Sequence, residues 1–155
     1  MKITLIAVGK QMPFWVTAGF LEYAKRMPSD YQLQLIEIAA EKRGKNSDMS
    51  KIMLTEEAKI TDAIPKQDNC IALDRIGKTV DTPTLAKQLH TWHDQQQNIC
   101  FVIGGPEGLS EKFLKKAQAI WSLSAMTLPH PLVRIVLAEQ LYRAWSMTVN
   151  HPYHR

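Results

Sequence analysis

The chain has few cysteines and no long apolar run, and both shortages exclude whole classes of protein. Its two cysteines, Cys70 and Cys100, lack the C-x-x-C spacing of redox and zinc motifs, so neither a disulfide framework nor a zinc-built domain is expected. No apolar segment approaches the ~20 residues that span a bilayer. The run in residues 1–8 is too short for a targeting segment. We therefore expect a cytoplasmic protein with no membrane partner.

The motifs of the common nucleotide-dependent and metal-dependent enzymes are also missing. There is no G-x-x-x-x-G-K-[ST] phosphate loop, no G-x-G-x-x-G dinucleotide fingerprint, no G-x-S-x-G elbow and no H-E-x-x-H pair. His90 and His93 lack the carboxylate or thiol that would complete a ligand set, so we expect them to face solvent and to bind no metal. Hydrolase, zinc-enzyme and ordinary Rossmann functions thus have no specific support.

What is present is an ordinary globular composition in which strand-length and helix-length segments alternate. The 155 residues are 45% hydrophobic and 22% charged, which suits one domain over residues 1–155. Apolar runs predict strands at 3–8, 33–38, 70–73 and 99–103, the second of them near a sheet edge. Helices are predicted at 14–27, at 48–64, from 82 (Thr82 as N-cap), after 110 (Ser110 as N-cap) and from 131 to about 149. The alternation predicts an α/β fold with a mostly parallel sheet flanked by helices.

Three segments are placed where an α/β protein would bind a ligand. Leu73–Lys78 and Gly104–Gly108 both follow the ends of expected strands. The third segment, Leu123–Leu128, alternates small or hydroxyl side chains with apolar ones and leads into His130 between two prolines. The proline after His130 disfavours helical backbone, so this histidine is expected in an extended stretch before the last helix. Taken singly, each segment could be a tight turn, and His130 could be structural.

The last third of the chain is unusually rich in functional residue types. The helix from residue 131 is apolar on nearly all sides, which predicts burial between the sheet and a second subunit. Glu139 and Arg143 are spaced to pair on one face, whereas Arg134 points to another side. The chain ends in Asn-His-Pro-Tyr-His-Arg, where most proteins have polar filler. Near the middle, Lys42, Arg43 and Lys45 surround Gly44, as either a solvated loop or an arm that contacts phosphates.

These motifs together resemble those of the ribosomal RNA large subunit methyltransferase H family, within the SPOUT, or α/β-knot, methyltransferases. The resemblance is carried by Ile103–Gly108, Trp121–Arg134, Glu139–Trp145, Asn150–Arg155, Lys42–Asn46 and Asp81–Pro83, and it runs over essentially the whole chain. It implies a homodimeric single-domain enzyme with a deep C-terminal trefoil knot. It further implies that S-adenosyl-L-methionine is the cofactor and that the product is a pseudouridine methylated at N-3 in 23S rRNA of assembled ribosomes.

The resemblance also assigns roles to individual residues. Cofactor contacts are expected at Leu73, Gly104, Leu123, Ser124, Ala125, Met126, Thr127 and Leu128. Because the imide proton of the target base must leave before its nitrogen attacks, a general base or a stabilising cation is needed. Candidate bases are His154, His130 and Glu139; candidate cations are Arg155, Arg143 and Arg134; and Tyr153 is a candidate contact to the target base. RNA binding is expected at Lys42, Arg43, Lys45 and Arg134.

The sequence leaves the general base unchosen and two other functions open. One is an α/β-knot enzyme that modifies another target, such as a tRNA base or ribose. The other is a non-enzymatic ribosome assembly factor, which would bind no S-adenosylmethionine.

Overall fold

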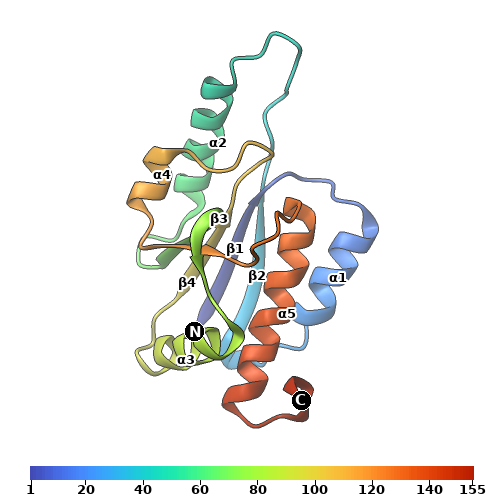
Figure 1. The fold of residues 1–155 in the computed structure, drawn as a ribbon, viewed down its shortest axis with the longest axis vertical. Helices are drawn as coiled ribbons and strands as arrows, with labels where there is room; N and C mark the ends of the chain where they lie inside the picture. Colours follow the sequence, from blue (N-terminus) through green and yellow to red (C-terminus); the bar gives the residue numbers. More distant parts are fainter.

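A five-stranded parallel sheet forms the centre of the computed structural model, which describes residues 1–155 (Figure 1). The sheet order is β2-β1-β4-β3-β5, and every neighbouring pair is parallel. The strands are β1 (Lys2–Val8), β2 (Gln32–Ile38), β3 (Asn69–Thr79), β4 (Ile99–Ile103) and β5 (Ala119–Ser122). The predicted parallel α/β architecture is therefore confirmed, and so is the edge position of the strand expected at 33–38.

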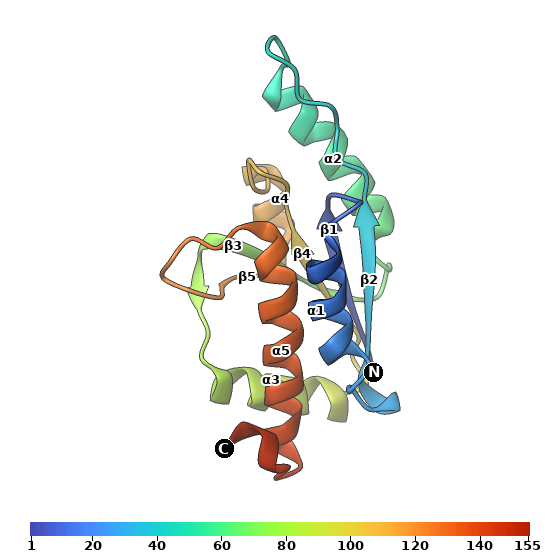
Figure 2. The ribbon, with the colours of Figure 1, turned by 90° about the vertical axis from the view of Figure 1, so that its right-hand side faces the viewer.

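Helices cover both faces of the sheet, which makes three layers (Figures 1 and 2). On one face, alternate residues of β1 and β4 pack in a single core with α1 (Phe14–Ala24), α3 (Thr82–Asp94) and α5 (His130–Thr148). On the other face, the intervening residues pack against α2 (Met49–Ala63) and α4 (Glu111–Lys116). Burial on both faces explains why the central strands are continuously apolar. None of these helices is both long and apolar enough to cross a membrane.

Most predicted helix boundaries are close to the observed ones, with three differences. The N-cap of α3 is Asp81, whose Oδ1 accepts a hydrogen bond from the Thr84 amide at 2.8 Å; the predicted cap, Thr82, instead donates its hydroxyl to Gln140 of α5 at 2.6 Å. Helix α1 ends at Ala24 rather than at residue 27. His130 is the first residue of α5 and does not lie in an extended stretch before it. Ser110 caps α4 as predicted.

Strand β5 is absent from the sequence-based prediction, and β3 is longer than predicted. Trp121 of β5 pairs with both Leu73 and Lys78 of β3, so β3 bends around the short strand. A Cβ atom on Gly77 would lie 2.5 Å from the carbonyl carbon of Trp121, which means that the two backbones are in direct contact. This contact requires glycine and places the chain after β5 over the carboxyl ends of β3 and β4. The trefoil knot implied by the resemblance stays a prediction.

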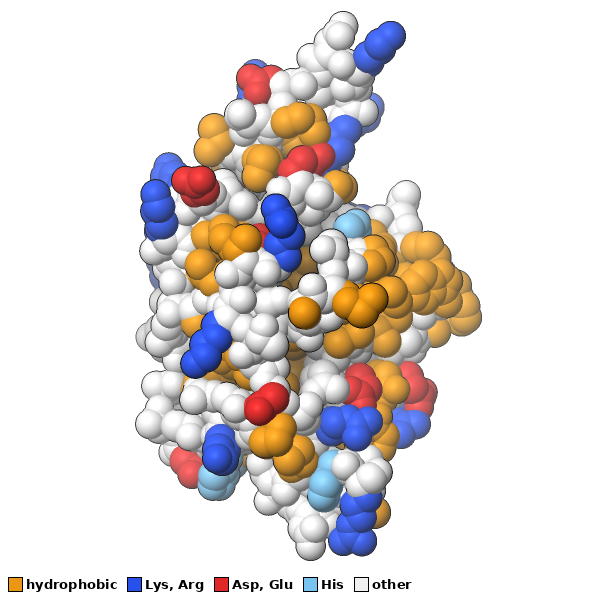
Figure 3. All heavy atoms as spheres, viewed as in Figure 1, with side chains coloured by type: hydrophobic (Ala, Val, Ile, Leu, Met, Phe, Trp, Pro, Cys, Tyr) orange, Lys and Arg blue, Asp and Glu red, His pale blue; other side chains and the backbone are white.

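The outer face of α1 is conspicuously apolar for a solvent-exposed helix. Phe14, Trp15 and Leu21 are each more than half exposed. Figure 3 shows a large hydrophobic area on the right, over the region of α1. Apolar patches of this kind commonly mark protein–protein contacts.

We predict that the substitution Gly77→Ala lowers the free energy of unfolding by about 2 kcal/mol, because the added methyl group has to push the β5 backbone away. Urea unfolding measures this loss. Gly44→Ala is the matched control: its new Cβ would meet only the Ser47 hydroxyl at 3.4 Å, so we expect nearly unchanged stability. Equal stability of the two variants would contradict a close backbone contact at Gly77.

Candidate functional site

A cavity of about 550 Å³ opens at the carboxyl edge of the sheet, where β3, β4 and β5 end. Three segments form its wall, namely Leu73–Arg75, Ile103–Gly108 and most of Trp121–His130, and Val133 of α5 completes it. These are the three segments that the sequence analysis singled out, and the structure brings them together at one site. Of the eight residues expected to contact a cofactor, only Ala125 does not line the cavity. Sequence reasoning missed Asp74, Arg75, Glu107 and Trp121, although each lies in or beside a recognised motif.

The loop after β4 is a tight turn that only glycine permits at two positions. The Gly108 amide donates to the Gly105 carbonyl at 2.9 Å, and Gly108 has a φ of 80°, in the left-handed region. A Cβ on Gly104 would come within 2.5 Å of the Gly108 backbone. The turn therefore presents bare backbone to the cavity, where a ligand can approach closely.

The segment after β5 is held by its own serines. The Ser122 hydroxyl donates to the Ser124 carbonyl at 2.9 Å, and the Ser124 hydroxyl accepts from the Met126 amide at 2.9 Å. These bonds fold the segment into a hairpin-like cover over the cavity and leave Met126 78% exposed. The serine hydroxyls of this segment thus form hydrogen bonds with the segment's own backbone.

His130 is the one histidine in the cavity wall, and its pKa is shifted. Its Nδ1 atom is buried and has no hydrogen-bond partner. Burial lowers the pKa of His130, and the positive charges of Arg134 and Arg43 lower it further. The lowered pKa favours the neutral imidazole near pH 7.

Arg134 lies one helical turn after His130 and is 1% exposed. Its guanidinium donates to Glu37 Oε1 at 2.7 Å and to the carbonyls of Gly9 and Val8 at 2.7 and 3.2 Å. These bonds tie α5 to the ends of β1 and β2. The contact between Arg134 and RNA that we expected from the sequence is incompatible with this burial, and the same holds for a direct role as a catalytic cation.

The remaining catalytic candidates lie from the middle of α5 onward and in the tail that follows it. Arg143 donates to Glu139 at 2.8 Å, as the helical spacing predicted, and its guanidinium lies 5.0 Å from the ring centre of Tyr153. The Tyr153 hydroxyl donates to Glu139 at 3.1 Å. Burial raises the pKa of Tyr153, and hydrogen bonds to Tyr23 and Glu139 add to the rise. These contacts among Glu139, Arg143 and Tyr153 hold the C-terminal tail, residues 150–155, against α5.

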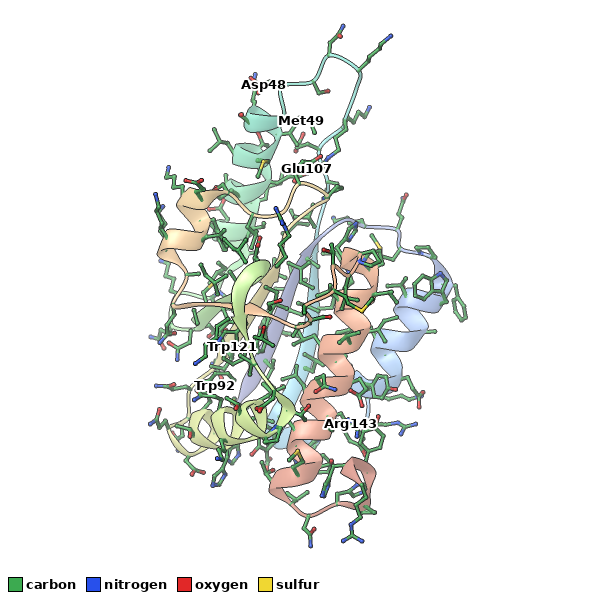
Figure 4. The ribbon with its side chains drawn as sticks, viewed as in Figure 1. Asp48, Met49, Trp92, Glu107, Trp121 and Arg143 are labelled. Atoms are coloured by element: carbon green, nitrogen blue, oxygen red, sulfur yellow. The ribbon has the colours of Figure 1, made fainter.

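This second group lies outside the cavity of its own chain. Glu139 is nine residues after His130, about 13 Å along the helix at 1.5 Å per residue, and no member of the group lines the cavity. In Figure 4, Glu107 of the cavity wall and Arg143 lie well apart. Within one chain, the structure therefore joins His130 to the expected cofactor residues and leaves Glu139, Arg143, Tyr153, His154 and Arg155 apart from them.

The segment with the three basic residues forms an arm that projects from the body between β2 and α2 (Figure 1). Lys42 and Lys45 are exposed and have no ion-pair partner, whereas Arg43 is paired with Glu56 and Glu107. The hydrogen bonds that Arg43 donates to Glu107 and then to Glu56 raise the pKa of Arg43, and the pKa of Glu107 is lowered chiefly by Arg43. An RNA contact remains open to the two lysines, but the guanidinium of Arg43 is already occupied.

The two other histidines named in the sequence analysis lie on α3. His90 is exposed as expected, whereas His93 is half-buried and stacks on Tyr31 with a centroid separation of 4.5 Å, so the expectation that it faces solvent is wrong. No three His, Cys, Asp or Glu side chains in the structure come close enough together to hold a metal ion.

Comparisons with known proteins agree with this arrangement. A family model described as "Predicted SPOUT methyltransferase" matches residues 1–154. A curated relative from Coxiella burnetii (strain Dugway 5J108-111), named "Ribosomal RNA large subunit methyltransferase H", is 56% identical over 155 residues, the full length of both chains. The solved structure of a probable methylase family protein from Haemophilus influenzae Rd KW20 is similar with a TM-score of 0.58 at 13% identity, covering 97% of this chain and 67% of that one. That last likeness shows the fold alone.

We predict that the His130 imidazole titrates below its ordinary value of about 6.5. The unfolded chain then binds the proton more readily than the folded one, so His130 makes stability fall as pH drops below that value. NMR titration of the ring protons measures the midpoint, and His130→Asn identifies the signal and should reduce the stability difference between pH 5.5 and pH 7.5. A midpoint at or above the ordinary value would exclude the buried, neutral imidazole.

Proposed function

Since this chain belongs to the SPOUT methyltransferase family, we propose that it is a cytoplasmic S-adenosylmethionine-dependent methyltransferase of large-subunit ribosomal RNA, with residues 1–155 acting as one domain. The observation that carries the proposal is the cavity at the carboxyl ends of β3, β4 and β5, walled by the segments that the family resemblance assigns to the cofactor. The name of the 56% identical relative supports ribosomal RNA as the substrate. The resemblance narrows the target to N-3 of a pseudouridine in 23S rRNA of assembled ribosomes.

The cavity fits the cofactor by its size and by its polar groups. Its volume of about 550 Å³ is in the range of small-molecule sites, and it exposes the backbone of the Gly104–Gly108 turn beside the apolar side chains of Leu73, Leu123 and Leu128. His130 also lines the cavity, although its Nδ1 atom is buried and has no hydrogen-bond partner. Bound S-adenosylmethionine supplies a methyl group that its sulfonium already activates. The protein's contribution is then to hold the target base in line and to manage its proton.

The proton of the target nitrogen has three candidate acceptors, His130, Glu139 and His154, and they lie in different places. His130 is neutral and lies in the cavity wall, so it can accept a proton there. Glu139 is committed to Arg143 and Tyr153, and we therefore assign it to holding the tail rather than to taking the proton. His154 and Arg155 remain free to meet the base when the tail reaches a cavity.

We propose that the tail reaches the cavity of a second copy, in a homodimer. The tail of each chain is held on α5, outside the cavity of its own chain, whereas a second chain can bring its tail to that cavity. The exposed apolar face of α1, at Phe14, Trp15 and Leu21, offers a surface for that partner (Figure 3). Each active site would then combine one chain's cofactor cavity with the other chain's Tyr153, His154 and Arg155.

The direct test uses ribosomes from a strain that lacks this gene. Mass spectrometry of their 23S rRNA should show one missing methyl group, and the purified protein with S-adenosylmethionine should restore it at a pseudouridine. A variant truncated after Pro152 should bind the cofactor with unchanged affinity but restore no methyl group. Normal methylation by that variant would exclude the tail from catalysis, and a missing mark on tRNA instead would redirect the substrate.

Mixing two inactive variants tests where the tail acts. The truncated chain keeps its cavity, and a Gly104→Val chain keeps its tail but blocks the turn that lines the cavity. Mixed dimers should regain methylation, with one competent site in each mixed dimer. Failure of the mixture to regain activity, with mixed dimers present by mass spectrometry, would contradict a site shared between two chains.

We predict that Lys42→Ala with Lys45→Ala weakens ribosome binding and flattens its salt dependence, because each lysine that leaves a phosphate lowers the number of released counterions by about one. Binding measured between 50 and 200 mM salt gives the slope. The control is Lys112→Ala with Lys115→Ala, which removes the same number of positive charges from exposed positions on α4. If both pairs change the slope equally, the arm is only a solvated loop.

A further inference from the structure

The guanidinium of Arg43 joins three parts of the molecule at one point. It lies on the arm between β2 and α2, and its partners are Glu56 of α2 and Glu107 of the Gly104–Gly108 turn. Nη1 and Nη2 donate to the two oxygens of Glu56 at 2.9 and 3.1 Å, while Nε and Nη2 donate to Glu107 at 3.1 and 2.6 Å. A further bond runs from Nη1 to the Glu41 carbonyl at 2.9 Å. All five N–H groups of the side chain therefore have an acceptor.

This arrangement lies directly behind the wall of the cavity. Glu107 and Gly105 line the cavity, whereas Arg43 and Glu56 do not. A Cβ added to Gly105 would lie 3.0 Å from Arg43 Nη2 and 3.1 Å from Glu56 Oε2, so the ion pair packs against the bare backbone of the turn. The side of the turn that faces away from the cavity is thus supported by charged groups in fixed positions.

Neither carboxylate has another cation to replace Arg43. Glu56 is only 4% exposed, and its one other hydrogen bond in the structure comes from the Glu41 amide at 2.9 Å. Glu107 has no second ion pair. Loss of the guanidinium would therefore leave one buried and one half-buried negative charge repelling each other beside the turn.

We propose that Arg43 is a positioning residue that holds the Gly104–Gly108 turn in the conformation required by the cofactor, and so links the basic arm to the cofactor cavity. This inference rests on the proposed function, in which the cavity binds S-adenosylmethionine. A bidentate contact to two carboxylates needs the planar fork of arginine, which a lysine ammonium does not provide. The sequence had suggested a phosphate contact for Arg43; the structure assigns it this internal position instead.

The test compares Arg43→Gln with the wild-type protein. We expect the affinity for S-adenosylmethionine to fall about tenfold by calorimetry, the cost of losing a set of charge-assisted hydrogen bonds. The KM for the cofactor should rise to a similar extent, while kcat at saturating cofactor stays close to the wild-type value, because Arg43 does not touch the reacting groups. Arg43→Lys should recover only part of the affinity.

Two further variants separate positioning from general stability. Lys59→Gln breaks the ion pair of Lys59 with Glu41, which joins the same arm to the same helix but does not touch the turn. It should leave cofactor affinity unchanged. Arg43→Gln combined with Glu56→Gln removes the unpaired buried carboxylate, so it tests the turn in a chain whose folding is less disturbed. Its cofactor affinity should still be reduced.

Hydrogen exchange of the cofactor-free protein gives a measurement that does not depend on the cofactor. The Gly108 amide, which donates to Gly105, should exchange faster in Arg43→Gln and in the double variant than in the wild type or Lys59→Gln. Unchanged exchange, or faster exchange with unchanged cofactor affinity, would overturn the inference. If the wild-type protein itself bound no S-adenosylmethionine, the proposed function would fail, and exchange alone would decide whether Arg43 holds the turn.

Discussion

The buried guanidinium of Arg134 is the interaction on which the arrangement of the site depends. It fixes the first turns of α5 to the ends of β1 and β2 through Glu37 and two backbone carbonyls. A buried ion pair that loses one partner costs about 3–5 kcal/mol, so this attachment is not readily exchanged for another. Because α5 is one continuous helix, the attachment at its beginning determines both the position of His130 at the cavity and the position of the tail at the far end.

Two arginines that lie behind the cavity wall, Arg134 and Arg43, were expected from the sequence to contact RNA, but in the structure both make internal ion pairs. Arg134 holds the helix that carries His130, and Arg43 is paired behind the Gly104–Gly108 turn. The net charge of +4 therefore does not describe the cations available to RNA. In our proposal, RNA is contacted by the exposed lysines of the arm, which have no carboxylate partners. The arginines lie where a planar guanidinium has to donate to several acceptors at once.

The sheet and the cavity segments were predictable because each has a local cause. Continuous apolar runs such as β1 and β4 follow directly from burial on both faces, and a ligand segment at the end of a parallel strand follows from the topology. Strand β5 was not predictable, since its four residues become a strand only by pairing with β3, which lies 40 or more positions earlier in the chain. The N-cap of α3 was misplaced because Asp81 and Thr82 are both suitable, and only the bond from Thr82 to Gln140 decides between them.

The composition of residues 150–155 predicted a functional tail, but only the structure shows where that tail lies. The pairing of Glu139 with Arg143 follows from helical spacing, but the contact of Tyr153 with both of them on α5, outside the cavity, does not. An enzyme built in this way can bind its cofactor in one chain and still lack the groups that engage the target base. In our proposal a second chain supplies these groups, and the residues that hold the tail on α5 are then needed as much as those that contact the substrate, because they set the position of the tail that the partner chain meets.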